Sequence, residues 1–288
     1  MAIEIEAGSM EDRAVGTLIG LAVGDALGTA VEFKPRGSFP PVTGMRGGGV
    51  FGLRPGEWTD DTSMALALAE ALAQDRSLSN PAFAMNRWVN WAHYGYYSHT
   101  GTCFDIGGQT SRALQAWHDF QRLPERDTEN AGNGGIMRLA PSVLANLHDR
   151  SAAIDVARRQ SDLTHRNAFC REIAGQMAGI LFDLIHGTAD GHAPQSIANR
   201  TEAEVDSSGY VVDTFEAAIW AFAPQDGFAN IVLRAVNLGD DADSVGAVAG
   251  QFAGARYGMS AIPAEWLEVL TWREEITSVG KGLFSKLG

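Results

Sequence analysis

The chain has 288 residues, of which 45% are apolar and 20% are charged, a composition typical of a globular protein with a sizeable core. Its formal net charge of −13 at pH 7 argues against nucleic acid as a partner, because nucleic acid is bound by basic surfaces. No stretch reaches the roughly 18 consecutive apolar residues of a transmembrane helix, and the acidic N-terminus does not resemble a signal peptide, so we expect no membrane contact. Two cysteines are too few for a disulfide framework, which favours a reduced, cytoplasmic protein.

Helical patterns predominate along the chain. Apolar and small residues recur at helical spacing through 11–31, and a loop rich in Pro and Gly follows over 34–57. Further helices are predicted over 62–75, 81–93, 108–121, 136–148, 151–162, 168–187, 212–222, 226–238 and 244–257. Strict alternation of β-branched residues is almost absent, and no change of composition marks a boundary. The sequence therefore predicts an all-α fold, a single compact multi-helix domain over 11–275, with 1–10 and 276–288 as tails and a monomer as the expected state.

The last of these helices carries glycines at every fourth position: Gly246, Gly250 and Gly254. This spacing places them on one face, so we expect a neighbouring backbone to approach closely there.

Two acid-rich segments each open a predicted helix: WTDDT (58–62) and GDDADS (239–244). Helix capping and the helix dipole favour acids at such positions, but they explain one aspartate better than two. Carboxylates and hydroxyls are the hard oxygen ligands that Mg²⁺ and Mn²⁺ prefer. Asp241 and Asp243 do not share a helix face, but at a turn they can converge on one or two ions. A divalent cation would cancel the repulsion among these aspartates, and we favour this interpretation over capping alone.

Other acid-rich motifs do not fit. An EF-hand loop counted from Asp241 would need an acid or amide where Val245 stands and a glutamate where Phe252 stands. The Asp-x-Asp motif of haloacid-dehalogenase-type phosphatases would need a preceding strand near the N-terminus and a lysine well downstream, and here it lies near the C-terminus. A phosphate-binding loop of the nucleoside triphosphatase type is absent from the sequence.

Five further features have both a structural and a functional interpretation. The GNGG stretch (132–135) is either a tight turn or a loop whose backbone N–H groups hold phosphate. Asp105, in FDIG, is either a helix cap or a functional acid. His165, in THRN, is either structural or part of a site, and Tyr210 is either a core aromatic or a stacking platform. Glu32 ends the first predicted helix, where simple solvation would also explain it.

Together these stretches resemble the ADP-ribosylglycohydrolase family, the group of the dinitrogenase-reductase-activating glycohydrolase. The matching segments are GLAVGDALGTAVEF (20–33), WTDDT (58–62), FDIG (104–107), GNGGIMR (132–138), THRN (164–167), SGYVVDT (208–214) and GDDADSVGAVAG (239–250). They occur in the family's order, and the pairing of WTDDT with the late aspartate cluster is the specific part of the match.

The resemblance implies an all-α fold with a centre of two Mg²⁺ or Mn²⁺ ions that cleaves a glycosidic bond at C1″ of ADP-ribose. It assigns metal ligation to two sets: Thr59, Asp60 and Asp61, and then Asp241, Asp243 and Ser244. The family often has Thr at the last position, and Ser244 keeps the hydroxyl.

The resemblance also implies catalytic roles for Asp105, Glu32 and Asp61, and the sequence leaves open which carboxylate is the general acid or base. The residues that would bind the substrate are Gly107, Asn133, Gly134, Gly135, Met137, His165 and Tyr210.

The expected activity is hydrolysis of the bond between ADP-ribose and an acceptor, with an ADP-ribosylated protein arginine favoured over serine. The alternatives are a small ADP-ribose or nucleoside-type substrate and a non-catalytic ADP-ribose-binding relative. The complete acid set argues against a non-catalytic relative, since such a protein would be expected to lose ligands.

Overall fold

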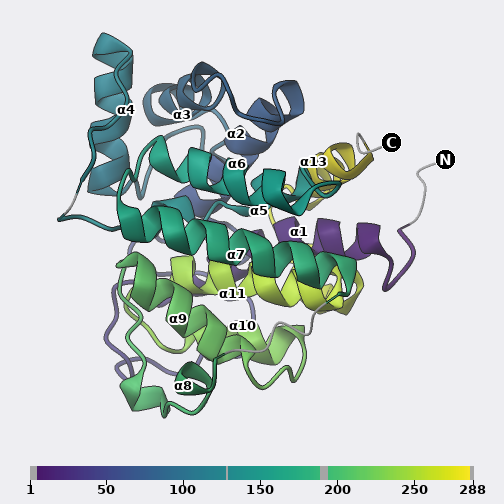
Figure 1. Cartoon of the computed structure of the whole chain (residues 1–288). Coiled ribbons are helices and arrows are strands. Elements are labelled where there is room, and N and C mark those ends of the chain that lie inside the picture. The colour runs from purple at the N-terminus through teal and green to yellow at the C-terminus, as the bar shows by residue number, and fades with distance from the viewer. Residues whose placement is uncertain (1–4, 128, 189–193, 286–288) are drawn as a thin grey trace.

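The computed structural model describes residues 5–127, 129–188 and 194–285, and the regular elements in these ranges are helices (Figure 1). The α-helices are α1 (Met10–Gly28), α2 (Asp60–Gln74), α3 (Ala82–Tyr94), α4 (Gly108–Phe120), α5 (Ala140–Leu144), α6 (Arg150–Asp162), α7 (Ala168–His186), α8 (Gln195–Ala198), α9 (Val211–Phe222), α10 (Phe228–Val236), α11 (Ala242–Tyr257), α12 (Ala264–Val269) and α13 (Arg273–Ser285). Three short 3₁₀ helices are η1 (Asn133–Gly135), η2 (Glu202–Glu204) and η3 (Met259–Ala261). The predicted all-α fold is confirmed.

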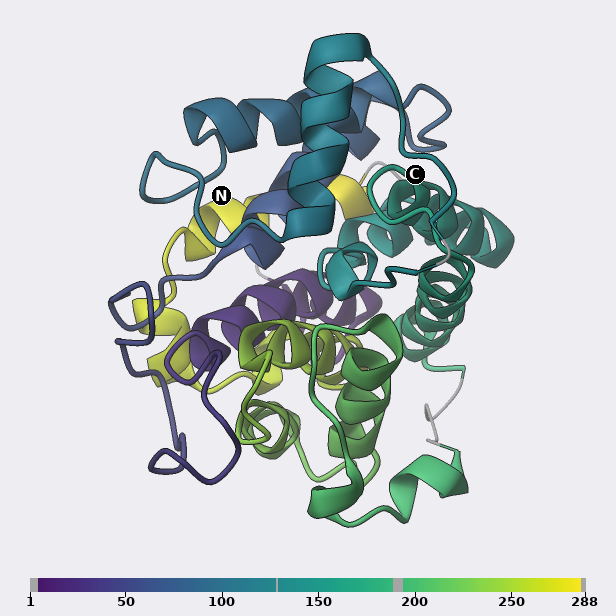
Figure 2. The ribbon, with the colours of Figure 1, turned by 90° about the vertical axis from the view of Figure 1, so that its left-hand side faces the viewer.

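Helices α1 and α11 form the centre of the molecule and lie against each other along their length (Figure 2). The expected glycine face of α11 is confirmed, and α1 presents matching glycines. A Cβ at Gly24 would overlap the carbonyl of Gly246, and a Cβ at Gly250 would overlap that of Gly20. The two backbones are therefore in direct contact, which larger side chains would prevent.

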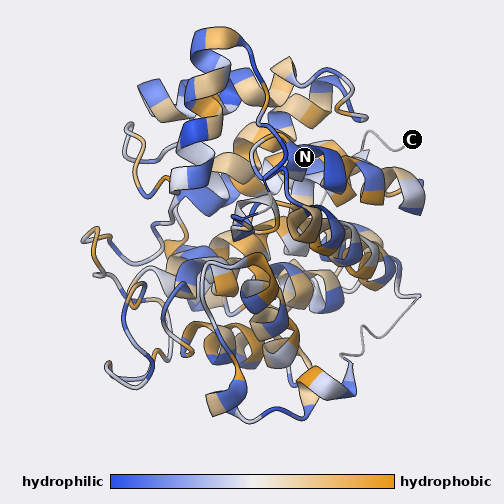
Figure 3. Ribbon diagram, turned by 60° about the vertical axis from the view of Figure 1, so that its left-hand side comes forward, coloured by the Kyte–Doolittle hydropathy of each residue, from blue (hydrophilic) through white to orange (hydrophobic). Residues whose placement is uncertain are grey.

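The other helices cover this central pair. In Figure 1, α2, α3 and α4 lie on one side of it, and α8, α9 and α10 lie on the other. Apolar residues of these helices form the buried core, and Figure 3 shows hydrophobic and hydrophilic residues interspersed along the helices. No helix within 5–127, 129–188 or 194–285 combines the length and apolar character that crossing a bilayer would require.

Three boundaries differ from the sequence prediction. The helix expected over 136–148 is reduced to the short α5, because Pro141 lacks an N–H group and is suited only to a helix's first turn. Residues 276–285, which were expected to belong to a tail, lie in α13, with Ile276 and Leu283 buried. At the other end, α1 begins at Met10, inside the expected tail 1–10, and the Ser9 hydroxyl caps it by accepting from Asp12 N at 3.0 Å.

Candidate metal and substrate site

A cleft of about 260 Å³ opens where the N-termini of α2 and α11 meet, beside the turn after α1 and the GNGG loop. The residues that line it are Glu32, Phe33, Asp60, Asp105, Gly107, Gly108, Gln109, Thr110, Gly132, Asn133, Gly134, Met137, His165, Gly209, Asp241, Asp243 and Ser244. The cleft thus brings together residues of every matching segment, from positions more than 200 residues apart in the chain, although Tyr210 of SGYVVDT does not line it.

Two predicted ligands, Thr59 and Asp61, do not line the cleft but lie fully buried directly behind it. The Thr59 hydroxyl donates to Asp243 Oδ2 at 3.4 Å, and the Ser244 hydroxyl donates to Asp61 Oδ1 at 3.4 Å. Each of these contacts joins the WTDDT segment to the GDDADS segment, so the two acid-rich segments lie against each other.

Two predicted substrate residues also lie outside the lining. Gly135 faces α6, since a Cβ there would overlap the hydroxyl of Ser161. Tyr210 is 39% exposed, so it is not a core aromatic, and its ring contacts Phe169 with centroids 6.5 Å apart. An isolated backbone bridge pairs Tyr210 with Gly132, which places it beside the GNGG loop.

Four buried acids and the half-buried Asp241 form two trios of oxygen donors. Within each trio, one carboxylate oxygen per residue lies within 4.8 Å of the others; the first trio is Asp60, Asp61 and Asp243, and the second is Glu32, Asp241 and Asp243. The implied division into a set from 59–61 and a set from 241–244 therefore differs from the arrangement of the carboxylates. Asp243 belongs to both trios, and Glu32 joins the second.

Several of these oxygens are buried without a hydrogen-bond partner among the described residues: Asp61 Oδ2, Asp243 Oδ1, Glu32 Oε2 and Asp105 Oδ2. Burial, reinforced by neighbouring carboxylates, raises the pKa of Glu32 to about 9 and that of Asp105 to about 7. The same causes raise the pKa of Asp61 and Asp243 well above the ordinary range. Buried, repelling oxygen donors without imidazole or thiolate fit a hard divalent cation.

Sequence reasoning missed Asp25, a fully buried acid on α1 that holds the start of α2. Its carboxylate accepts four hydrogen bonds, from the backbone N–H and hydroxyl of Thr59, both at 2.9 Å, and from those of Thr62, at 3.1 and 2.6 Å. Thr59 occupies the N-cap position, but its side chain bonds to Asp25 and makes no cap hydrogen bond. The signal in the sequence was a single acid inside the apolar run GLAVGDALG (20–28).

A backbone clip holds Glu32 at the cleft. Phe33 N donates to Asp240 O at 2.7 Å, and Asp240 N donates to Lys34 O at 2.9 Å, which ties the turn after α1 to the turn before α11. Phe33, Asp105 and Asp240 all have left-handed backbone conformations, with φ of 58°, 59° and 53°. Such conformations are unfavourable for residues with a Cβ and tend to cluster at functional sites.

On the other side of the cleft, the GNGG loop contacts both Asp241 and His165. The Asn133 amide donates to Asp241 Oδ2 at 2.6 Å and to Thr214 Oγ1 at 2.9 Å, so it orients an acid of the second trio. Gly134 packs against the imidazole of His165, and a Cβ at this position would overlap the ring. Glycine is therefore required for the loop to lie beside the histidine.

His165 is held by a buried hydrogen-bond chain that starts at Arg138. Arg138 Nη2 donates to Thr164 Oγ1 at 2.6 Å, and that hydroxyl lies 2.8 Å from His165 Nδ1. Because arginine can only donate, the Thr164 hydroxyl accepts from Arg138 and can donate its own proton to His165 Nδ1. Nδ1 then acts as an acceptor, and this favours the tautomer with its proton on Nε2, which faces Gly132. Burial lowers the pKa of His165 to about 3, so the ring is neutral near pH 7.

Arg138 is itself a buried cation that the sequence analysis did not single out. It is fully buried with its guanidinium 4.0 Å from the centroid of a Trp88 ring, and Nε donates to Gln160 Oε1 at 3.1 Å. Burial lowers its pKa to about 9, while the charges of Asp60 and Asp61 oppose that shift. This side of the cleft thus carries a permanent positive charge near the acids.

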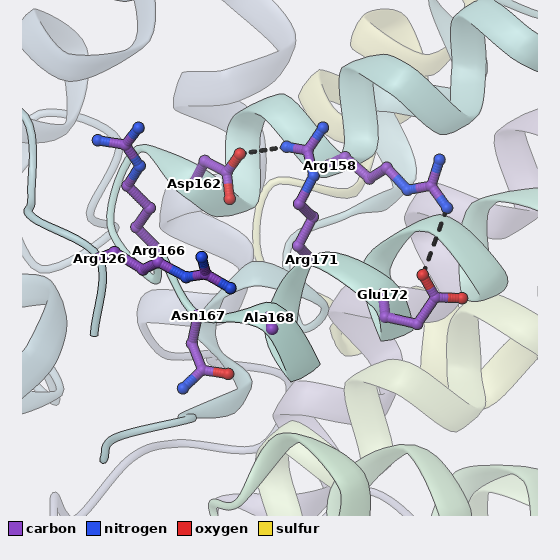
Figure 4. A pocket seen from close by; sticks show the side chains of 8 residues that line it. All are labelled: Arg126, Arg158, Asp162, Arg166, Asn167, Ala168, Arg171 and Glu172. Carbon is purple, nitrogen blue, oxygen red and sulfur yellow. Dashed lines mark hydrogen bonds and ion pairs between the residues drawn. The ribbon is translucent and has the colours of Figure 1, made fainter. Parts of the chain in front are cut away.

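A second cavity, of about 500 Å³, lies outside the cleft and is rich in arginine (Figure 4). Its lining residues are Arg126, Arg158, Asp162, Arg166, Asn167, Ala168, Arg171 and Glu172. None of the motifs in the sequence indicated a site here.

Comparison with known proteins identifies the family. The ADP-ribosylglycohydrolase family matches this chain over residues 7–288, and the chain therefore belongs to that family. The resemblance drawn from the motifs is confirmed over nearly the whole sequence.

Individual relatives agree with this assignment. ADP-ribosylarginine hydrolase Tri1 of Pseudomonas putida (strain GB-1) is 41% identical, over 96% of this chain and 78% of that protein. ADP-ribosyl-[dinitrogen reductase] glycohydrolase of Rhodospirillum rubrum is 33% identical, over 93% of both chains. A solved structure described as an ADP-ribosylglycohydrolase-related protein complex is 38% identical, with a TM-score of 0.82 over 96% of this chain and 98% of that chain.

Proposed function

We propose that this chain is a hydrolase that removes ADP-ribose from arginine side chains of modified proteins and that it uses two Mg²⁺ or Mn²⁺ ions. The observation that carries the proposal is the pair of acid trios that share Asp243 in the cleft. The names of the Pseudomonas putida and Rhodospirillum rubrum relatives support the reaction, and the first of them supports arginine as the acceptor.

The acids and hydroxyls of the two convergent segments would hold the ions: Thr59, Asp60, Asp61, Asp241, Asp243 and Ser244. The ions, when bound, would polarise ribose hydroxyls and lower the pKa of a coordinated water. The protein's contribution is to fix these donors in place. Asp25 holds Thr59, and Asn133 holds Asp241, so neither ligand depends on the ion for its orientation.

Cleavage requires the bond between C1″ and the guanidine nitrogen to break while a water oxygen bonds to C1″. The departing nitrogen must take up a proton, because a free guanidine anion is far too basic to leave. Glu32, a member of the second trio, and Asp105 both line the cleft, and their raised pKa values make both available as proton donors near pH 7. Replacing each by its amide will show which one supplies the proton.

The opposite side of the cleft would hold the anionic part of ADP-ribose. Gly134 and Gly135 belong to η1, and N–H groups in a helix's first turn lack intrahelical acceptors and suit a diphosphate. Neutral His165 adds a further hydrogen-bond donor, its Nε2–H, for the diphosphate. A charged imidazolium would instead be attracted to the carboxylates of the ion site. Exposed Tyr210, beside this loop, is suited to stack on the adenine ring.

The experiment measures release of ADP-ribose from an arginine-ADP-ribosylated protein with Mg²⁺, with Mn²⁺ and with chelator, beside a serine-ADP-ribosylated control. We expect release from arginine only, and only with a metal ion. Release from serine alone would change the assigned acceptor from arginine to serine but leave the assignment of the metal site unchanged. Metal-dependent binding of ADP-ribose without release from either protein would favour a small-molecule substrate or a binding role.

A further inference from the structure

The arginine-rich cavity is joined to the candidate cleft by a third, smaller cavity. This connecting cavity, of about 170 Å³, shares Gln109 with the cleft and Arg166 with the arginine-rich cavity, and it adds Arg112 and Arg122 to its lining. A continuous surface therefore runs from the rim of the cleft to the N-terminus of α7. We call its six arginines the arginine belt: Arg112, Arg122, Arg126, Arg158, Arg166 and Arg171.

Only part of the belt is neutralised within the protein. Arg171 forms an ion pair with Asp162, and Arg158 forms a long one, at 3.5 Å, with Glu172 (Figure 4). The other four arginines form no ion pair with any carboxylate in the described ranges, although Arg166 donates to the Pro124 carbonyl and Arg122 lies near the Phe120 ring. All four are exposed.

The belt stands out because the molecule as a whole is acidic. The formal net charge is −13, whereas the arginine-rich and connecting cavities together are lined by six arginines and four carboxylates, Asp162, Glu172, Glu125 and Asp127. The N-terminus of the 19-residue helix α7 opens at Ala168 in the same cavity and adds the positive end of its dipole. Arginine pairs with carboxylates through planar, two-point hydrogen bonds, so the belt suits an anionic, carboxylate-bearing partner.

We propose that the arginine belt docks an acidic patch on the ADP-ribosylated protein substrate. This inference rests on the proposed function, because only a protein-linked substrate extends beyond the cleft. The belt begins at the cleft rim, and its free arginines are exposed, which suits the surface of a partner better than a small enclosed ligand. Nucleic acid is a poorer fit, because a long polyanion would also meet the surrounding acidic surface.

The belt would then contribute to substrate selection without taking part in the reaction. Contacts between exposed charges are screened by salt and chiefly affect how readily the partner is captured. The effect should therefore appear in KM for acidic substrates and leave kcat unchanged.

The test compares peptides that each carry one ADP-ribosylated arginine, flanked by aspartates in one peptide and by serines in the other. Free ADP-ribosyl-arginine serves as a third substrate, which has no flanking peptide residues. For the wild-type enzyme we expect a KM about 10-fold lower for the aspartate peptide than for the serine peptide at low salt, with the difference shrinking as salt is added. The double variant Arg122→Glu and Arg126→Glu should abolish this difference while leaving turnover of free ADP-ribosyl-arginine unchanged.

Two matched variants control for charge and fold. Arg122→Lys with Arg126→Lys should retain most of the preference, since the charges remain. Arg273→Glu with Lys281→Glu makes the same change of net charge on α13, away from the belt, and should retain the preference fully.

Equal KM values of the wild-type enzyme for the two peptides would overturn the docking proposal. An equal loss on all three substrates in the belt variant would also overturn it, because the belt would then act on ADP-ribose itself. If the wild-type enzyme cleaves none of the three, the proposed function fails. Fluorescence anisotropy of the uncleaved peptides then still decides whether the belt prefers the acidic flank.

Discussion

The two sides of the candidate cleft differ in how their buried polar atoms are satisfied. On the acidic side, Asp61 Oδ2 and Asp243 Oδ1 lie buried without a hydrogen-bond partner in the described part of the chain. On the opposite side, Arg138, Thr164 and His165 form a continuous hydrogen-bond chain. A buried carboxylate without a partner is energetically costly, so the acidic side is suited to bind cations from solution. The polar groups of the opposite side already satisfy one another through hydrogen bonds.

The largest effect should follow from Asp243→Ala, since this acid belongs to both trios. We expect kcat/KM for free ADP-ribosyl-arginine to fall on the order of 1,000-fold or more, because the bound ions would supply several kcal/mol of transition-state stabilisation. The metal-free variant should melt no lower than the metal-free wild type, because a repelling buried charge has been removed. Activity within threefold of wild type would show that the acidic side is not the ion site.

Asp25→Asn tests whether the acidic side depends on its support from α1. One amide oxygen cannot accept the four hydrogen bonds that the carboxylate accepts. We expect Mn²⁺ affinity, measured by titration calorimetry, to weaken about 10-fold and the free energy of unfolding to fall by about 1–2 kcal/mol.

Thr62→Ala is the matched control for this experiment, because Thr62 bonds to Asp25 but is not a proposed ligand. It should lower stability and leave Mn²⁺ affinity unchanged. Equal loss of affinity in both variants would mean that Asp25 acts only through the fold of α2.

Thr164→Val probes the organised side by removing the hydroxyl between Arg138 and His165. We expect KM to rise about 10-fold with little change in kcat, because a fixed donor to the substrate is lost. The ¹⁵N chemical shifts of His165 should report a change in the population of its tautomers. Thr164→Ser keeps the hydroxyl and should behave as wild type. Unchanged ¹⁵N chemical shifts of His165 in the valine variant would show that the hydrogen-bond chain from Arg138 through Thr164 does not set the His165 tautomer.

The smallest effect concerns stability and pH in the absence of metal. The folded chain holds protons on Glu32 and Asp105, whose pKa values are raised to about 9 and about 7, and the unfolded chain releases them near pH 4.5 and 3.8. Stability therefore falls as pH rises through these folded-state values. We expect Tm with chelator to drop by roughly 5 °C between about pH 7 and 9 and the gain from Mn²⁺ to grow over the same range. A chelated Tm that rises across this window would contradict the assignment.

The sequence was sufficient to predict features that depend on local pattern. Helical periodicity located most helices, and the spacing of Gly246, Gly250 and Gly254 predicted the close packing of α11. The helix over 273–285 was missed because two glycines weaken its pattern, yet Gly280 is the position where α13 packs against Val15 of α1.

The site was only partly predictable, because its geometry depends on contacts between distant segments. The composition of the two aspartate clusters predicted that they would share a purpose. It did not show that Asp243 joins both trios, that Asp25 supports α2, or that Arg138 reaches His165 through Thr164. Each of these depends on contacts among α1, α2 and α11 or on the turn between α6 and α7.

The most direct test of the central claim counts metal ions. Wild-type protein and Asp243→Ala, each equilibrated with excess Mn²⁺ and desalted, are measured by elemental analysis alongside protein concentration. We predict about two ions per wild-type chain and almost none in the variant, since both trios lose a shared ligand. A wild-type chain without bound ions, or a variant that retains the wild-type number, would contradict the account.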